Sequence, residues 1–139
     1  MRRDAAGNKA AQRGMASLEF VLVLPVFLLL FFGIIEFGIL LWQRHVVFEA
    51  AAEGARLATF HADAGEVEAE VREWLLGGGV TREPTILVGT CAPSPTPQPV
   101  DVSVGVDFSF IVLPGFVEEL AGVRRIETTA SAVCEWDGV

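Results

Sequence analysis

One stretch near the N-terminus combines a peptide bond, a carboxylate and an aromatic ring at a spacing that could do chemistry. It reads Gly14-Met15-Ala16-Ser17-Leu18-Glu19-Phe20 and follows a basic segment. If a peptidase cleaves after Gly14, Met15 carries a new N-terminal amine and Glu19 lies four residues further on. On a helix this spacing puts the amine and the carboxylate on one face, about 6 Å apart along the axis. The amine, with an ordinary pKa of about 8, would be a cation able to partner that carboxylate, within one chain or between neighbouring chains.

An apolar segment follows this stretch directly, and its length matches the thickness of a lipid bilayer. Phe20 to Trp42 is a run of 23 residues interrupted only by Glu36. As a helix it would be about 34 Å long, against about 30 Å for the hydrocarbon core of a membrane. Pro25 lies near the start of the run, where a membrane helix tolerates it, and Trp42 supplies an aromatic anchor at the outer interface. We predict a transmembrane helix over residues 15–42.

Two acidic residues accompany the apolar run. Glu19 lies at its cytoplasmic edge, where a carboxylate is less unfavourable than the roughly 2 to 3 kcal/mol or more it costs at the bilayer centre. A plain membrane anchor does not explain Glu19, so we consider it a functional candidate. Glu36 lies near the outer end, and there we expect a solvated edge residue, with a role in helix packing or an ion relay as the alternative.

The charge distribution predicts the orientation of the chain. Residues 1–14 form a basic leader with four basic side chains and one acidic side chain, a net charge of +3, whereas the whole chain has 10 Lys+Arg, 18 Asp+Glu and a net charge of −8. The positive-inside bias predicts a cytoplasmic leader and an extracytoplasmic domain over residues 43–139. Because a nucleic-acid binder needs a basic face, the acidic remainder argues against nucleic acid as a partner.

The extracytoplasmic part has patterns for both helices and strands. Small residues over 46–60 extend the first helix to about 45 residues and give it a face that a sheet or a second helix can approach closely. Asp63 is placed to cap a second helix that Gly77-Gly78-Gly79 would end. Residues 92–99 form a Pro-rich loop that we expect to be neither sheet nor helix. Further elements are expected as strands at 85–90, 100–110 and 126–136 and a short helix at 114–120.

The predicted fold class is therefore α+β. A long N-terminal transmembrane helix continues into an envelope domain, where a helix packs on a small antiparallel sheet of about three strands. Cys91 and Cys134 are the two cysteines, and an oxidising compartment favours one disulfide that closes the Pro-rich loop onto the last strand. The alternative, a metal site or a catalytic thiol, lacks partners, because His45 and His61 are too few and too distant in sequence for a zinc site.

No pattern of an enzyme is present in the sequence. The serines lack a Gly-x-Ser-x-Gly setting, and the glycine triplet lacks the lysine and the spacing of a phosphate loop. We therefore expect no catalytic residues, no metal and no cofactor.

Residues 13–60 resemble the TadE-like pseudopilins of the Flp/Tad pilus system. The resemblance is carried by Gly14-Met-Ala-Ser-Leu-Glu-Phe-Val-Leu-Val-Leu-Pro25, Phe32-Gly-Ile-Ile-Glu-Phe-Gly38 and Glu53-Gly-Ala-Arg-Leu-Ala58. These are minor pilin-like proteins whose leader is removed at the cytoplasmic membrane face by an aspartate-type prepilin peptidase. The resemblance implies that Gly14 precedes the scissile bond, that Met15 becomes the mature N-terminus, and that Glu19 and Phe20 are the recognition and assembly pair.

The resemblance also implies a pilin-like shape, partners and a location. The implied partners are the prepilin peptidase, the major Flp-type pilin, other TadE/TadF-like pseudopilins, the Tad membrane platform and the lipid bilayer. The implied location is a single pass through the inner membrane and, after assembly, the pilus or the cell surface. Two alternatives stay open: an uncleaved membrane-anchored envelope protein with a binding domain, and a secreted domain released after Ala50-Ala51-Ala52.

Overall fold

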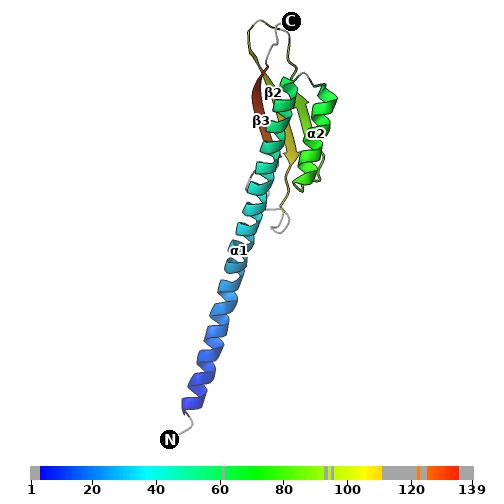
Figure 1. The fold of residues 1–139 in the computed structure, drawn as a ribbon. Coiled ribbons are helices and arrows are strands. Elements are labelled where there is room, and N and C mark those ends of the chain that lie inside the picture. The colour runs from blue at the N-terminus through cyan, green and yellow to red at the C-terminus, as the bar shows by residue number, and fades with distance from the viewer. Residues whose placement is uncertain are drawn as a thin grey trace.

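The computed structural model of the chain describes residues 4–60, 62–92, 94, 96–110, 122 and 125–134, with the backbone alone at 4–14 and 16. The predicted α+β class is confirmed. The described elements are α1 (Asp4–Thr59), α2 (Ala64–Gly77), β1 (Thr85–Val88), β2 (Gln98–Asp107) and β3 (Arg125–Cys134). Figure 1 shows α1 as a long rod whose upper part lies against the sheet and α2. We call this packed part, the described residues between 43 and 134, the head.

Helix α1 is longer than the sequence predicts. It has 56 residues and begins at Asp4, inside the basic leader, rather than near Met15. Alanine is the best helix former, and the leader is rich in it, which favours this extension. The bond between Gly14 and Met15 consequently lies within a helix.

The sheet has the order β1-β2-β3, and both pairings are antiparallel. The predicted alternation along β2 is confirmed, because Val100, Val102, Val104 and Val106 are all buried. On β3 the alternate residues Ile126 and Cys134 are buried, while Val133 is exposed. One face of the sheet therefore supplies the core, against α1.

The boundaries of the strands differ from the prediction at several points. β1 ends at Val88, and β2 begins at Gln98 and ends at Asp107, so Pro99 belongs to a strand and pairs with Val133. A proline is tolerated there because β1 pairs only with the later part of β2, which leaves an open edge beside Pro99. The expected helix at 114–120 and the end of the expected last strand at Trp136 lie outside the described residues.

Small residues bring α1 against the rest of the head. Ala50, Ala51 and Ala55 are buried. A Cβ on Gly54 would lie 2.7 Å from Val71 Cγ2 and 3.2 Å from Val102 Cγ1, so this close approach requires glycine. The small-residue face that the sequence predicts is thus confirmed as the contact between α1, α2 and the sheet.

Helix α2 starts and stops where the sequence predicts. The Asp63 side chain accepts a hydrogen bond from the Gly65 backbone N–H at 3.3 Å, which caps the helix. The helix ends at Gly77, and its buried stripe of Val67, Val71 and Leu75 faces the core. Contacts of Gly54 with Val71 and of Val46 with Gly78 show that α2 runs back along α1.

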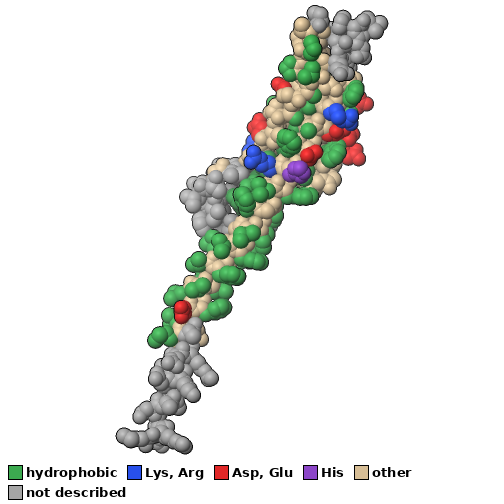
Figure 2. Space-filling view, turned by 60° about the vertical axis from the view of Figure 1, so that its left-hand side comes forward, with side chains coloured by type: hydrophobic (Ala, Val, Ile, Leu, Met, Phe, Trp, Pro, Cys, Tyr) green, Lys and Arg blue, Asp and Glu red, His purple; other side chains and the backbone are tan. Residues whose placement is uncertain are grey.

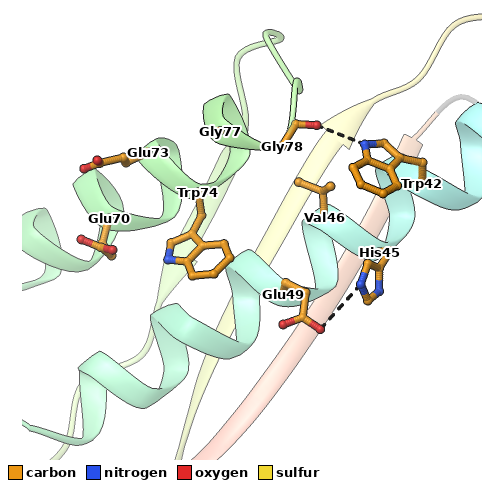
Figure 3. Close-up of a pocket in the computed structure, with 9 residues that line it drawn as sticks. All are labelled: Trp42, His45, Val46, Glu49, Glu70, Glu73, Trp74, Gly77 and Gly78. Carbon is orange, nitrogen blue, oxygen red and sulfur yellow. Dashed lines mark hydrogen bonds and ion pairs between the residues drawn. The ribbon is translucent and has the colours of Figure 1, made fainter.

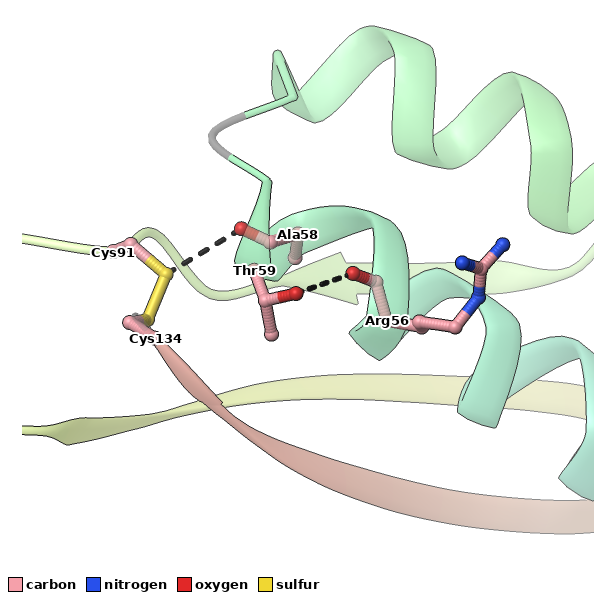
Figure 4. Close-up of a disulfide and its surroundings, with 5 residues drawn as sticks. All are labelled: Arg56, Ala58, Thr59, Cys91 and Cys134. Atoms are coloured by element: carbon pink, nitrogen blue, oxygen red, sulfur yellow. Dashed lines mark hydrogen bonds between the residues drawn. A yellow bond between two sulfur atoms is a disulfide. The ribbon is translucent and has the colours of Figure 1, made fainter. Parts of the chain in front are cut away.

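The expected disulfide joins Cys91 to Cys134, with a Cα–Cα distance of 5.9 Å. Figure 4 shows the bond beside the C-terminal end of α1, where Cys91 Sγ lies 3.4 Å from the carbonyl oxygen of Ala58. The disulfide therefore ties the connection after β1 to the end of β3, next to the last turn of α1.

Candidate functional site in the N-terminal half of α1

The N-terminal half of α1 carries large apolar side chains with little cover. We call residues 15–41 of α1 the apolar rod. Among the described residues, α1 is the one helix long and apolar enough to cross a membrane, which fits a single-pass membrane anchor. Figure 2 shows its surface as mostly hydrophobic side chains, with an acidic side chain near the lower end. Large exposed members include Phe20, Leu22, Val26, Phe27, Leu30, Ile34 and Phe37.

The predicted processing and assembly residues lie at the end of the rod that is farthest from the head. Gly14 lies in the helix backbone. The Met15 side chain is 74% exposed and that of Phe20 is 64% exposed, and Glu19 is exposed as well. Because α1 is continuous here, Met15 and Glu19 are about one turn apart on one face. This spacing is the one that the predicted amine–carboxylate pairing requires, and Phe20 adds an accessible ring beside Glu19.

Glu36 does not lie where the sequence suggests. We expected a solvated edge residue, but the side chain of Glu36 is 0% exposed. The expectation was that the carboxylate reaches the interface, but the face of the helix that carries Glu36 is covered, while Ile35 and Phe37 on either side are exposed. The interpretation as a solvated edge residue is wrong.

Trp42 contacts the head directly. Its indole Nε1–H donates a hydrogen bond to the carbonyl oxygen of Gly78, at 3.2 Å. Gly78 has to be glycine because a Cβ there would lie 2.3 Å from Val46 Cγ1. Trp42 thus links the top of the apolar rod to the end of α2, in addition to the interfacial position that the sequence predicts for it.

One ionisable pair among the described residues, in the head part of α1, has shifted pKa values. Arg56 Nη2 lies 2.5 Å from Glu53 Oε1. Hydrogen bonding to Arg56 lowers the pKa of Glu53, and hydrogen bonding to Glu53 raises the pKa of Arg56. The two residues are three positions apart on α1, so this is an ion pair within one helix. Within the described part of the chain, no group of three or more His, Cys, Asp or Glu side chains could hold a metal ion.

One feature of the surface was missed by the sequence analysis. Trp42 and Trp74 are 32 positions apart, yet both line a groove between α1 and α2. The signal was present in the sequence, because two helices joined by a short turn fold back on each other. Pairing α1 and α2 in this way would have brought the two tryptophans to the same end of the helix pair.

No curated protein and no solved structure matches the chain. The model of the family described as TadE-like protein matches residues 14–56. The match starts at the predicted scissile glycine, covers the apolar rod and ends within the packed part of α1. This family links the segment to the Flp/Tad pilus. The resemblance predicted from the sequence is confirmed for this segment: the chain is TadE-like over residues 14–56.

Proposed function

We propose that the chain is a minor pilin-like protein of a Flp/Tad-type pilus, processed by a prepilin peptidase after Gly14 and used in pilus assembly or adhesion. The observation that carries this proposal is the apolar rod, which exposes large side chains such as Phe20 and Leu30 along one helix while the head is folded at its other end. An apolar surface that runs along the whole rod is typical of a contact with a membrane or with other proteins. A subunit that passes from lipid to a helical assembly needs both contacts on the same surface.

The proposed topology places the basic leader in the cytoplasm and the head outside the inner membrane. The net charge of +3 in the leader supports this orientation through the positive-inside bias. The Cys91–Cys134 disulfide supports an oxidising compartment for the head. The apolar rod then crosses the bilayer as a single pass.

Processing has to act on a helical bond in this account. Gly14 lies ten residues after the start of α1 at Asp4, and a glycine in a helix interior is less favourable than alanine by about 1 kcal/mol. Local unwinding at this position therefore costs less than at the alanines around it. We propose that this weak point gives the peptidase access to the bond between Gly14 and Met15.

Removal of the leader creates the charge pair that assembly uses. The new amine of Met15 lies one turn from Glu19, and either this amine or that of a neighbouring subunit can neutralise the carboxylate. Neutralisation lowers the penalty of enclosing Glu19 among apolar helices. The partners that we propose are the peptidase, the major Flp-type pilin, other TadE/TadF-like pseudopilins and the Tad membrane platform, and we propose no catalytic activity or cofactor.

The test is pilus assembly in the native cell with Glu19→Ala, compared with Glu66→Ala, which removes an exposed acid on α2. We expect deletion of the chain to abolish assembled pili. We expect Glu19→Ala to lower pilus yield at least tenfold at an unchanged level of the protein in the membrane, and Glu66→Ala to have no effect. Normal pilus yield in the deletion strain would overturn the proposal and favour a membrane-anchored envelope protein.

A further inference from the structure

A groove between α1 and α2 carries a combination of side chains that the proposed function does not use. Its volume is about 490 Å³, within the range of about 300 to 1,000 Å³ for sites that bind small ligands. Val46 and Gly78 contribute to its lining, and Trp42 and Trp74 are its two aromatic side chains. Figure 3 shows Trp74 reaching from α2 toward α1, and Trp42 reaching from α1 toward the end of α2.

The tryptophans are both accessible, and one is held in place. Trp42 is 61% exposed and Trp74 is 45% exposed. The hydrogen bond from Trp42 Nε1 to the carbonyl oxygen of Gly78 fixes the orientation of that indole. Tryptophan is the best aromatic partner for a cation placed over its ring. The groove therefore presents two accessible indoles, one of them preorganised.

The charged side chains of the groove all have the same sign. Glu49, Glu70 and Glu73 belong to the lining, together with His45, and the lining contains no Lys or Arg. Glu49 Oε1 lies 4.0 Å from His45 Nε2. Arg56 is held by Glu53 and is not part of the lining. Arg56 also attracts Glu70 from outside the lining. The lining itself thus offers three carboxylates and no cationic Lys or Arg beside two indoles.

We propose that this groove binds a lysine or arginine side chain of a partner protein, through the indoles of Trp42 and Trp74 and the carboxylates of Glu49, Glu70 and Glu73 that line it. Charge complementarity favours such a partner. A second copy of this acidic chain, with a net charge of −8, is a poor donor of the cation.

A zwitterionic membrane lipid also carries a cation, but it is a less favourable occupant of the groove. A zwitterionic headgroup carries an ammonium group and a phosphate a few bonds away. The three carboxylates that attract the ammonium group repel the phosphate, because like charges in partly desolvated sites are unfavourable. A basic side chain flanked by apolar residues matches the carboxylates, the indoles and the apolar floor at Val46 together.

The test is binding of a short peptide to the full chain in detergent micelles. The probe is acetyl-Leu-Arg-Leu-amide, and its uncharged isostere, with citrulline in place of arginine, is the control ligand. We expect the citrulline peptide to bind at least about tenfold more weakly, because the cation provides most of the attraction. The indole N–H resonances of Trp42 and Trp74, assigned with Trp42→Phe and Trp74→Phe, should shift with the arginine peptide, and the affinity should fall with added salt.

Two sets of variants with equal charge change make the test specific. The groove set is Glu49→Gln, Glu70→Gln and Glu73→Gln, and the control set is Glu66→Gln, Glu68→Gln and Glu127→Gln, none of which lines the groove. We expect the groove set to weaken binding of the arginine peptide at least tenfold and the control set to leave it within twofold. A thermal unfolding curve for each variant confirms that the head is folded.

Three results would overturn the proposal. The first is equal binding of the arginine and citrulline peptides, and the second is equal loss of affinity in the two sets of variants. The third is displacement of the peptide by phosphatidylethanolamine in nanodiscs but not by phosphatidylglycerol, which would assign the groove to a lipid amine. The site does not depend on processing after Gly14, so these results are independent of the proposed function.

Discussion

The two halves of α1 share one continuous backbone and have opposite surfaces. Residues 20–35 carry large apolar side chains that are mostly exposed, whereas residues 46–58 include five alanines and a glycine, most of them buried under the sheet and α2. Small residues allow backbones to approach closely and pack permanently within one chain. Large exposed residues leave a surface that lipid or other helices must cover. The second half of α1 thus makes the contacts that stabilise the head, and the first half leaves an apolar surface for contacts with lipid or other helices.

The largest expected difference is between the head and the apolar rod, and it comes from truncating one leucine in each. Leu75 of α2 packs in the head and is buried, whereas Leu29 of the apolar rod is exposed. We expect Leu75→Ala to lower the free energy of unfolding of the head by about 2 to 5 kcal/mol, since it leaves a cavity. Leu29→Ala should change it by less than about 0.5 kcal/mol. Urea unfolding of the full chain in detergent measures both, and equal effects would contradict the division between the head and the apolar rod.

The disulfide provides the next largest effect, confined to the head. Cys91 and Cys134 are 43 positions apart, so cross-linking restricts the unfolded chain by about 4 kcal/mol in the chain-entropy description, within a typical range of about 2 to 4. We expect the double variant Cys91→Ala and Cys134→Ala to lose about this much stability. Helicity of the apolar rod, followed by circular dichroism after the head has unfolded, should persist in the variant. Simultaneous loss of the rod would show that the two halves fold as one unit.

Two glycines of α1 offer a matched comparison with opposite signs. A Cβ on Gly54 would meet Val71 and Val102, whereas a Cβ on Gly38 meets nothing within 4 Å. We expect Gly54→Ala to destabilise the head by about 1 to 3 kcal/mol through overpacking. Gly38→Ala should be neutral or raise helix stability by up to about 1 kcal/mol. Thermal unfolding of both variants distinguishes them, and a stabilising Gly54→Ala would refute the close packing of α1.

The smallest expected effect concerns the surface charges of the packed half. The lowered pKa of Glu53 means that its pairing with Arg56 stabilises the head above the ordinary glutamate pKa of about 4.5 and that this stabilisation is lost as the pH falls through the lowered value. Glu53→Gln should remove this component of the pH dependence. Unfolding curves of parent and variant between pH 3 and pH 7 should therefore converge at the acidic end. A gap that persists at the acidic end would assign the effect to something other than ionisation.

Local sequence patterns correctly predicted those features of the head that lie within a single helix or strand. The alternation from Val100 to Val106 identified the buried face of β2, and Asp63 and the glycines after Leu76 marked the ends of α2. The pairing of the cysteines followed from their number and the compartment. The strand and the helix ends are determined by neighbouring residues, and two cysteines allow only one pairing within the chain.

The features that the sequence missed depend on neighbours in space. Pro99 lies in a strand because β3 pairs with it on one side while the other side is open. Glu36 is buried by the surrounding protein, which the sequence of α1 alone does not show. The groove at Trp42 and Trp74 exists because α2 runs back along α1. The proposed processing residues, in contrast, were predicted from a short motif, and the continuous helix places Met15 and Glu19 about one turn apart on one face.

The most direct test of the account is the intact mass and N-terminal sequence of the protein isolated from native membranes. The account predicts a mature chain that begins at Met15 and lacks residues 1–14. Gly14→Ala should abolish this processing, whereas Gly7→Ala in the same leader should leave it unchanged. A chain that still carries Arg2 and Arg3 in the parent protein would contradict the account and remove prepilin processing from the mechanism.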